Sequence, residues 1–173
     1  MASDVNPMEH PPGTGQSAEP LDWSAWYAET LDALVAQIGA ASIQWGTDPD
    51  GEQYIIEGQQ RPAGVEYPLA MILEFRKVRD DAASDRDEEL YDINANVSVF
   101  DRDDPRDYDS NLRKTVGQMG AVQSALYDDR SLGGTCEYLY VEETTAFELE
   151  TERTGETVGS IDLRIKKEAK HPY

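Results

Sequence analysis

Residues 92–100 constrain the fold more than any other part of the sequence. Apolar and polar side chains alternate there almost strictly, with Ile93, Ala95, Val97 and Val99 on one parity and Asp92, Asn94, Asn96 and Ser98 on the other. Because successive side chains of a strand point to opposite faces of a sheet, this pattern predicts a strand with one buried and one hydrated face. Such strands favour an antiparallel sheet that is covered on one side only.

Three further segments show a similar alternation. The apolar sets are Leu69, Met71, Leu73 and Phe75 in residues 69–77, Leu139, Val141, Phe147 and Leu149 in residues 137–150, and Ile161, Leu163 and Ile165 in residues 160–167. We expect each set to face the core. The opposite, uncovered face should then be hydrated or form an interface. It would present Glu74, Arg76, Asn94, Asn96, Ser98, Tyr138, Tyr140, Asp162, Arg164 and Lys166.

Weaker strand patterns occupy residues 43–46 and 53–57. They flank the sequence Asp48-Pro49-Asp50-Gly51, which is typical of a turn. We expect these two short strands to pair with each other across that turn.

Two segments have helical periodicity. Residues 22–38 repeat apolar side chains at steps of three and four, with Asp22 as the expected N-cap and Gly39 at the expected C-terminal cap. Trp23 and Trp26 lie on this stripe, and aromatic residues at helical spacing favour a core role over a partner surface. The second helix is expected to begin at Ser110, with an apolar stripe of Leu112, Val116, Met119, Val122 and Leu126.

Gly117 and Gly120 lie inside this second helix. Each costs a helix about 1 kcal/mol relative to alanine, so we expect a close approach of the helix to a strand or to a neighbouring subunit.

These elements predict a single α+β domain at residues 21–168, preceded by a proline- and glycine-rich disordered arm at residues 1–20 and followed by a tail at residues 169–173. The expected architecture is a two-layer sandwich, a mainly antiparallel sheet of about 4–6 strands with two helices on one face. Residues 80–89 and 101–109 should be charged loops, Gly133 and Gly134 should release the chain into the third strong strand, and residues 154–156 should turn.

The chain is strongly acidic, with 35 Asp and Glu residues against 15 Lys and Arg and a net charge of −20. Such a surface is favoured in concentrated salt, where screening removes the repulsion between carboxylates. It disfavours nonspecific DNA binding through the general surface. The longest mostly apolar stretch, residues 31–43, is too short to span a bilayer, and no signal peptide is expected.

The sequence offers little support for catalysis. Carboxylates are so frequent that close pairs arise by chance, and the aspartates of residues 101–109 lack the glycine and glutamate of a calcium loop, having Arg106 and Leu112 there. His10 and His171 lie near the chain ends, and the lone Cys136 is expected to be a buried thiol. We therefore assign no catalytic, cofactor or metal residue, and we favour an assembly or binding protein. A small halophilic hydrolase built on Asp, Glu, Tyr and Arg is the alternative of another class.

Basic residues cluster at residues 76–79 and 164–170. We favour ion pairing with neighbouring carboxylates, and the alternative is an electropositive spot for an acidic neighbour or passing DNA.

The order of elements in residues 21–168 resembles the tail terminator proteins of long-tailed, siphovirus-like viruses, here of a haloarchaeal virus. The resemblance rests on the helix at residues 22–38, the strand at residues 91–100, the loop and helix at residues 109–127, and the closing strands at residues 137–150 and 160–167.

This resemblance implies a hexameric ring without catalytic residues that caps the tail tube, stops its growth and docks it to the neck of the virion after assembly in the host cytoplasm. The implied partners are further copies of the chain, the tail-tube protein and the neck or connector protein, and contact with passing genomic DNA without sequence specificity stays open. A head–tail adaptor or tail completion protein of the same neck is the alternative. The candidate interface residues are Arg76, Arg79, Asp101, Asp103, Arg106, Asp107, Gly117, Gly120, Arg164 and Lys166.

Overall fold

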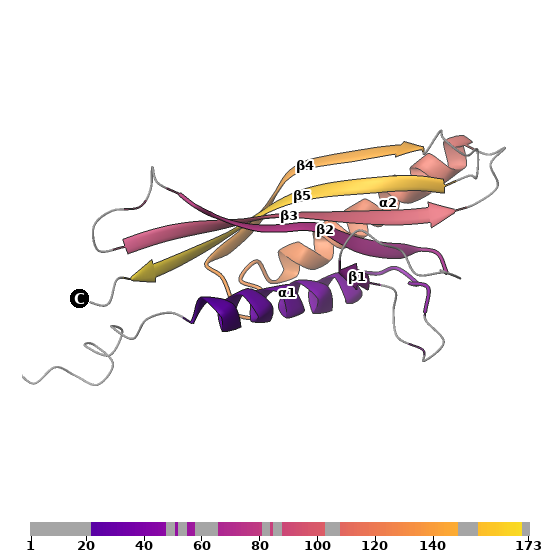
Figure 1. Ribbon diagram of the computed structural model, residues 1–173. Coiled ribbons are helices and arrows are strands. Elements are labelled where there is room, and N and C mark those ends of the chain that lie inside the picture. Colours follow the sequence, from indigo (N-terminus) through magenta and orange to yellow (C-terminus); the bar gives the residue numbers. More distant parts are fainter. Residues whose placement is uncertain are drawn as a thin grey trace, which may run out of the picture.

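The computed structural model describes residues 22–47, 51, 55–57, 66–80, 84, 88–102, 108–148 and 156–170. Its elements are α1 (Trp23–Gly39), β1 (Ile55–Glu57), β2 (Leu69–Arg79), β3 (Glu88–Arg102), α2 (Tyr108–Asp128), β4 (Tyr138–Glu148) and β5 (Glu156–Lys170). The strands form one five-stranded sheet in the order β1-β2-β3-β5-β4. Both helices lie on the same side of it (Figure 1). The predicted two-layer α+β sandwich is confirmed.

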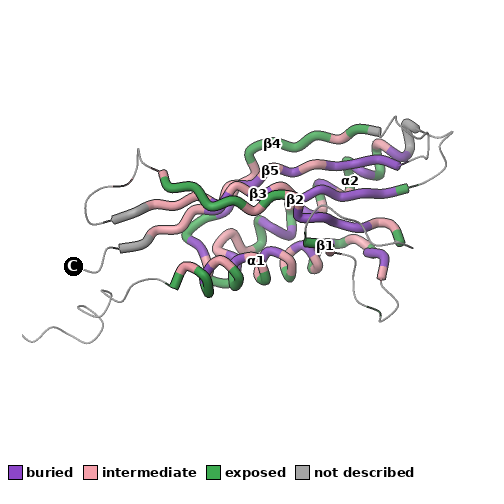
Figure 2. Tube along the Cα trace, in the orientation of Figure 1, coloured by how far each residue is buried: buried purple, intermediate pink, exposed green. Residues whose placement is uncertain are grey.

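The core lies between the helices and the two central strands. Ile93, Val97, Ile161 and Ile165 are fully buried, and they pack in one cluster with residues of both helices. Figure 2 shows the buried parts of β3 and β5 above the helix layer. The predicted faces of residues 92–100 and 160–167 are therefore confirmed.

Helix α1 starts as predicted and ends one residue later. The Asp22 carboxylate accepts a hydrogen bond of 3.1 Å from the Ala25 N–H, as an N-cap should. Gly39 is still helical, and the cap is Ala40 in a right-handed conformation, because its N–H bonds to carbonyls of the last turn. No left-handed glycine is used to end this helix.

The tryptophans of α1 serve the core. Trp26 is 4% exposed, and its indole N–H donates to the carbonyl of Thr135. Trp23 is partly buried and meets the ring of Tyr91 edge-on at 4.4 Å.

Helix α2 differs from the prediction in its start and its buried face. It begins at Tyr108, ahead of Ser110, so Ser110 is not the N-cap. Thr115 takes an inward position and its hydroxyl meets that of Thr157 on β5, whereas Val116 is 54% exposed. A polar residue can face the core here because its hydroxyl is paired.

The glycines of α2 do not approach a strand. A Cβ added at Gly117 or Gly120 would have no atom within 4 Å. The close approach lies instead at Gly159 on β5, where an added Cβ would come within 2.4 Å of Met119 Cγ. The expected contact with a strand is thus wrong for Gly117 and Gly120, and contact with a neighbouring subunit stays a prediction.

The weak strands pair differently from the prediction. Residues 43–46 form no strand, and β1 pairs in parallel with β2, with Ile55 opposite Ala70. The backbone of Gly46 instead donates a hydrogen bond of 2.8 Å to Pro68. The edge of β2 offers β1 a longer hydrogen-bonding partner than residues 43–46 do.

The strands are longer than the alternation indicated, which shortens the expected loops. Residues 88–89 and 101–102 belong to β3, residue 109 to α2, and residues 156 and 169–170 to β5. The expected arm at residues 1–20, the acidic residues 103–107, Leu149 and the turn at residues 154–155 lie outside the described residues. Gly133 and Gly134 have positive φ angles of 66° and 84° between α2 and β4, as a chain reversal there requires.

Candidate assembly surface

The face of the sheet opposite the helices, here called the helix-free face, carries its side chains in rows that cross β2, β3, β5 and β4. In the order of those strands, the apolar row holds Leu69, Phe100, Val158 and Phe147, and the second row holds Met71, Ser98, Ser160 and Thr145. The acidic row holds Glu74, Asn96, Asp162 and Glu143, and the basic row holds Arg76, Asn94, Arg164 and Tyr140. The last row holds Val78, Asp92, Lys166 and Tyr138. All ten residues predicted for the uncovered face stand in these rows.

Two register shifts decide which residues reach this face. β2 changes register between Ile72 and Glu74, and β4 between Val141 and Glu143. An extra residue in a strand reverses the parity of the side chains that follow it. Both shifts flank the acidic row, because Glu74 pairs with Asn96 and Glu143 with Asp162.

The shifts correct two of the predicted core sets. Phe75, Leu139 and Val141 do belong to the core on the helix side. Leu69 and Met71, with the partly buried Leu73 against them, form a second cluster on the helix-free face, and Phe147 lies in the same row there. The helix-side positions of β2 before its shift are Ala70 and Ile72.

Part of the helix-free face is deeply buried. Leu69, Phe100 and Val158 of the apolar row and Met71 of the second row are all buried, although neither of the described helices covers them. Beside them lies a groove of about 670 Å³, lined by Leu73, Phe100, Phe147 and Val158 with Ser98 and Ser160 among its polar members. Phe147 is 42% exposed at its edge.

The acidic row borders this groove. Asp162 and Glu143 stand directly opposite each other on β5 and β4. The Asn96 amide donates hydrogen bonds of 2.7 Å to Asp162 Oδ1 and 2.8 Å to Ser160 Oγ. Among the described residues, no cation forms an ion pair with Asp162 or Glu143. Like charges that face each other across two strands destabilise a sheet unless something neutralises them.

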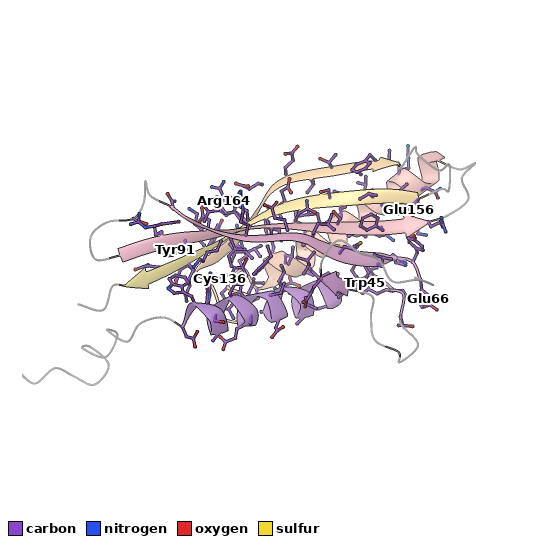
Figure 3. All side chains as sticks on the ribbon, in the orientation of Figure 1. Trp45, Glu66, Tyr91, Cys136, Glu156 and Arg164 are labelled. Atoms are coloured by element: carbon purple, nitrogen blue, oxygen red, sulfur yellow. The ribbon has the colours of Figure 1, made fainter. Side chains whose placement is uncertain are left out.

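The basic residues, in contrast, are paired. Arg164 lies on the helix-free side of the sheet (Figure 3), with its Nη2 2.7 Å from Glu142 Oε1 and its Nε 3.8 Å from Asp92 Oδ2. Burial alone would lower the pKa of Arg164, but the negative charges of Glu142 and Asp92 raise it above its ordinary value. Arg76 pairs with Glu74 at 3.4 Å. This geometry agrees with ion pairing of the basic cluster.

The other candidate interface residues are scattered over the molecule. Asp101 is 3% exposed on the helix side, bound to Lys114 at 3.0 Å and to Gln118 at 2.8 Å. Arg79 is exposed at the end of β2, and Lys166 lies in the last row. Gly117 and Gly120 are exposed on α2. Asp103, Arg106 and Asp107 lie outside the described residues. The structure thus brings Arg76, Arg164 and Lys166 together on one face.

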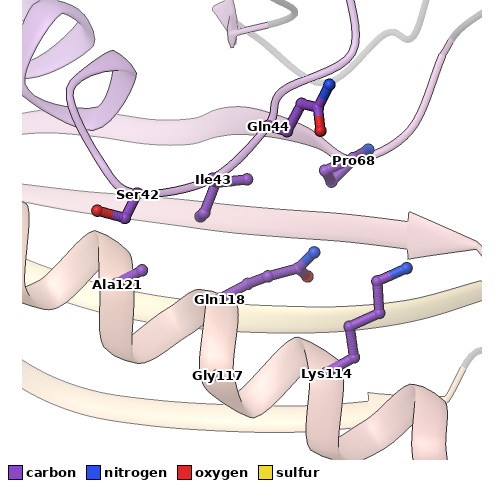
Figure 4. A pocket seen from close by; sticks show the side chains of 8 residues that line it. All are labelled: Ser42, Ile43, Gln44, Pro68, Lys114, Gly117, Gln118 and Ala121. Atoms are coloured by element: carbon purple, nitrogen blue, oxygen red, sulfur yellow. The ribbon is translucent and has the colours of Figure 1, made fainter.

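A second hollow, of about 410 Å³, separates α2 from residues 42–44 and Pro68 (Figure 4). Lys114, Gly117 and Gln118 line its α2 side. The Gln118 amide donates to Asp101, and its Oε1 is buried without a hydrogen-bond partner among the described residues. Lys114 and Gln118, which line this hollow, are the two residues that bind the buried carboxylate of Asp101.

The apolar groove was missed by the sequence reasoning, although the sequence carries a signal for it. The residues Leu69-Ala70-Met71-Ile72-Leu73 are apolar on both parities. A continuous apolar run is typical of a strand that is buried on both faces. The alternation of Leu69, Met71, Leu73 and Phe75 with a mostly polar set concealed that signal.

The remaining described features are the thiol of Cys136, the possible metal ligands and the apolar character of the helices. Cys136 is 5% exposed, as expected, and burial raises the pKa of its thiol to about 11. Within the described ranges, no group of three or more His, Cys, Asp or Glu side chains is placed to hold a metal ion. None of the helices described here combines the length and the apolar character that a membrane crossing needs.

Comparison with known proteins finds similarity in structure. No family model and no curated protein matches the sequence. A chain from a solved structure described as "Virion of native gene transfer agent (GTA) particle" is similar in structure, with a TM-score of 0.45 and 12% sequence identity over 85% of this chain and 95% of that chain.

Proposed function

We propose that this protein is a structural component of a virus particle, a tail terminator that caps the tail tube as a ring and joins it to the head–tail connector. The observation that carries the proposal is the helix-free face, where charged and apolar rows lie side by side on the side of the sheet away from both described helices. Ordered surface charge of this kind is typical of surfaces that recognise other proteins.

The order of elements also supports this function. The resemblance to tail terminators rests on a leading helix, a central strand, a second helix and two closing strands, and α1, β3, α2, β4 and β5 follow one another in that order. In this reading, the partners are further copies of the chain, the tail-tube protein and the neck protein.

A ring needs two different contact surfaces on each subunit, because its contacts are heterologous. The helix-free face is one candidate. The outer side of α2 is the other, since Gly117 and Gly120 weaken the helix by about 1 kcal/mol each and have free space beside them within the subunit. A neighbouring subunit that packs closely on α2 would explain both glycines.

Light scattering in molar KCl tests the ring, because the net charge of −20 favours concentrated salt. We expect the wild type to be larger than a monomer. Gly120→Gln suits a helix and has room in the monomer, so it should leave the fold intact and reduce assembly. Ala28→Gln on the exposed side of α1 is the matched control and should assemble normally. A chain that stays monomeric even with tail-tube protein present would refute the proposal.

Light scattering of mixtures with purified tail-tube protein or connector protein separates the terminator from a head–tail adaptor. A terminator should bind purified tail-tube protein as well as the connector, whereas an adaptor should bind only the connector. The position of the gene gives an independent check, since a terminator gene should lie between the connector genes and the gene of the major tail-tube protein.

A further inference from the structure

The groove on the helix-free face has the dimensions of a binding site. Its volume of about 670 Å³ lies within the range of about 300–1,000 Å³ that is common for ligand sites. Phe100 and Val158 form part of its lining and are 9% and 4% exposed, while Phe147 at its edge is 42% exposed. An apolar side chain entering the groove would remove Phe147 from water and gain contact with Leu73 and Phe100.

The acidic row lies two rows from the apolar row along the strands. Asp162 and Val158 are four residues apart on β5, which corresponds to about 13 Å in a strand. Asp162 and Glu143 face each other, and the Asn96 amide at 2.7 Å neutralises neither charge. The side of the groove toward the acidic row is therefore electronegative, and its natural counterpart is a cation.

We propose that the helix-free face is a docking site for a segment of a partner protein that carries an apolar side chain and, about 13 Å further along, a lysine or arginine. The apolar side chain enters the groove and contacts Phe100 and Phe147. The cation binds between Asp162 and Glu143. This inference deepens the proposed function, because it gives a chemistry to one partner of the assembly.

Charge complementarity favours such a partner over a second copy of this face. In the basic and last rows of the helix-free face, the cations Arg76, Arg164 and Lys166 are already ion-paired with carboxylates of their own subunit, Arg164 at 2.7 Å. Arg102, beyond the apolar row, lies over the ring of Tyr67. An identical face would therefore offer Asp162 and Glu143 no uncommitted cation from these rows. A basic segment of a different protein would bind without breaking these pairs.

Panning a library of random dodecapeptides on the immobilised full-length protein tests the site. The panning is done in a salt concentration at which circular dichroism shows the protein to be folded. We expect the enriched peptides to combine an aromatic or aliphatic residue with Lys or Arg. No enrichment, or enriched peptides without a basic residue, would overturn the proposal.

Two variants then locate the binding. Phe147→Ser removes the apolar edge of the groove, and the double variant Glu143→Gln, Asp162→Asn removes the charges while it keeps an acceptor for Asn96. Each should weaken an enriched peptide at least tenfold, a change that fluorescence anisotropy resolves. The matched controls Val116→Ser on α2 and the double variant Glu29→Gln, Asp32→Asn on α1 alter exposed residues elsewhere and should bind normally. Equal binding by all variants would overturn the site.

The result is separable from the test of the ring. If the chain assembles in molar KCl but no peptide binds, the docking site is wrong and the proposed function stands. If peptides bind at the groove while the chain stays monomeric with tail-tube protein present, the docking site stands and the terminator function is wrong.

Discussion

Asn96 donates a hydrogen bond of 2.7 Å to Asp162 at the level of the sheet where both β2 and β4 change register. The neutral amide stands between Glu74 on β2 and Asp162 on β5. It thus places a neutral side chain between the acidic residues on the two strands that flank β3.

Replacing this amide by a carboxylate should destabilise the protein. Asn96→Asp removes a donor to a charged group and adds a like charge beside Asp162, so we expect a loss of about 2 kcal/mol or more at neutral pH. Urea unfolding measures the loss, which should shrink in molar salt. Asn94→Asp is the matched control, because Arg76 and Arg164 flank that position, and its cost should be smaller. Equal costs at both positions would contradict this account of the rows.

Gly159 should tolerate no side chain, unlike the glycines of α2. An added Cβ there would lie 2.4 Å from Met119 Cγ and 3.1 Å from Thr115 Cγ2. Gly159→Ala should therefore cost about 1–3 kcal/mol through overpacking. Gly117→Ala, with free space around it, should stabilise the monomer by up to about 1 kcal/mol. Urea denaturation compares the two, and effects of the same sign would argue against this packing of α2 on β5.

Gln37 of α1 joins the two helices. Its amide donates hydrogen bonds of 3.0 Å to the carbonyl of Ala125 and 3.0 Å to that of Asp129, at the C-terminal end of α2. Gln37→Glu would direct a carboxylate at these carbonyls and at the negative end of the helix dipole, so we expect a loss of about 1–3 kcal/mol. Ala36→Glu, one residue away and exposed, should cost less. Thermal unfolding near neutral pH and near pH 4 checks this prediction. The new carboxyl is protonated near pH 4, so the loss of stability should be smaller there.

Cys136 should make stability depend on alkaline pH. Burial raises the pKa of its thiol from 9.0 to about 11, so the folded protein holds this proton more tightly than the unfolded chain. Its contribution is complete below pH 9 and is lost as pH rises through 11. The pKa of Tyr27 is also raised by burial, which adds a loss of the same sign. Urea midpoints of wild type and Cys136→Ala, measured across this pH range, separate the contribution of the thiol from that of other groups. Parallel curves for the two proteins would contradict the raised pKa of Cys136.

The alternation of side chains was sufficient to predict the layers of the fold. Residues 92–100 and 160–167 show the period of two throughout, and both face the helices as expected because neither strand changes register. The predicted start of α1 at Asp22 also holds, since an N-cap depends on a contact three residues away. The candidate interface is a different case, because Asp101 is buried while Gly117 and Gly120 lie on an exposed side of α2.

Local sequence therefore determined the two helices and the four long strands, which polar side chains lie on the helix-free face, and that the chain is strongly acidic. These properties follow from side chains a few residues apart. Only the tertiary structure decided where the apolar groove lies, because Leu73 and Phe147 reach the helix-free face through register shifts set by pairing with β3 and β5. It also decided that Gly159 is the glycine pressed against a helix, since that contact joins residues far apart in the chain.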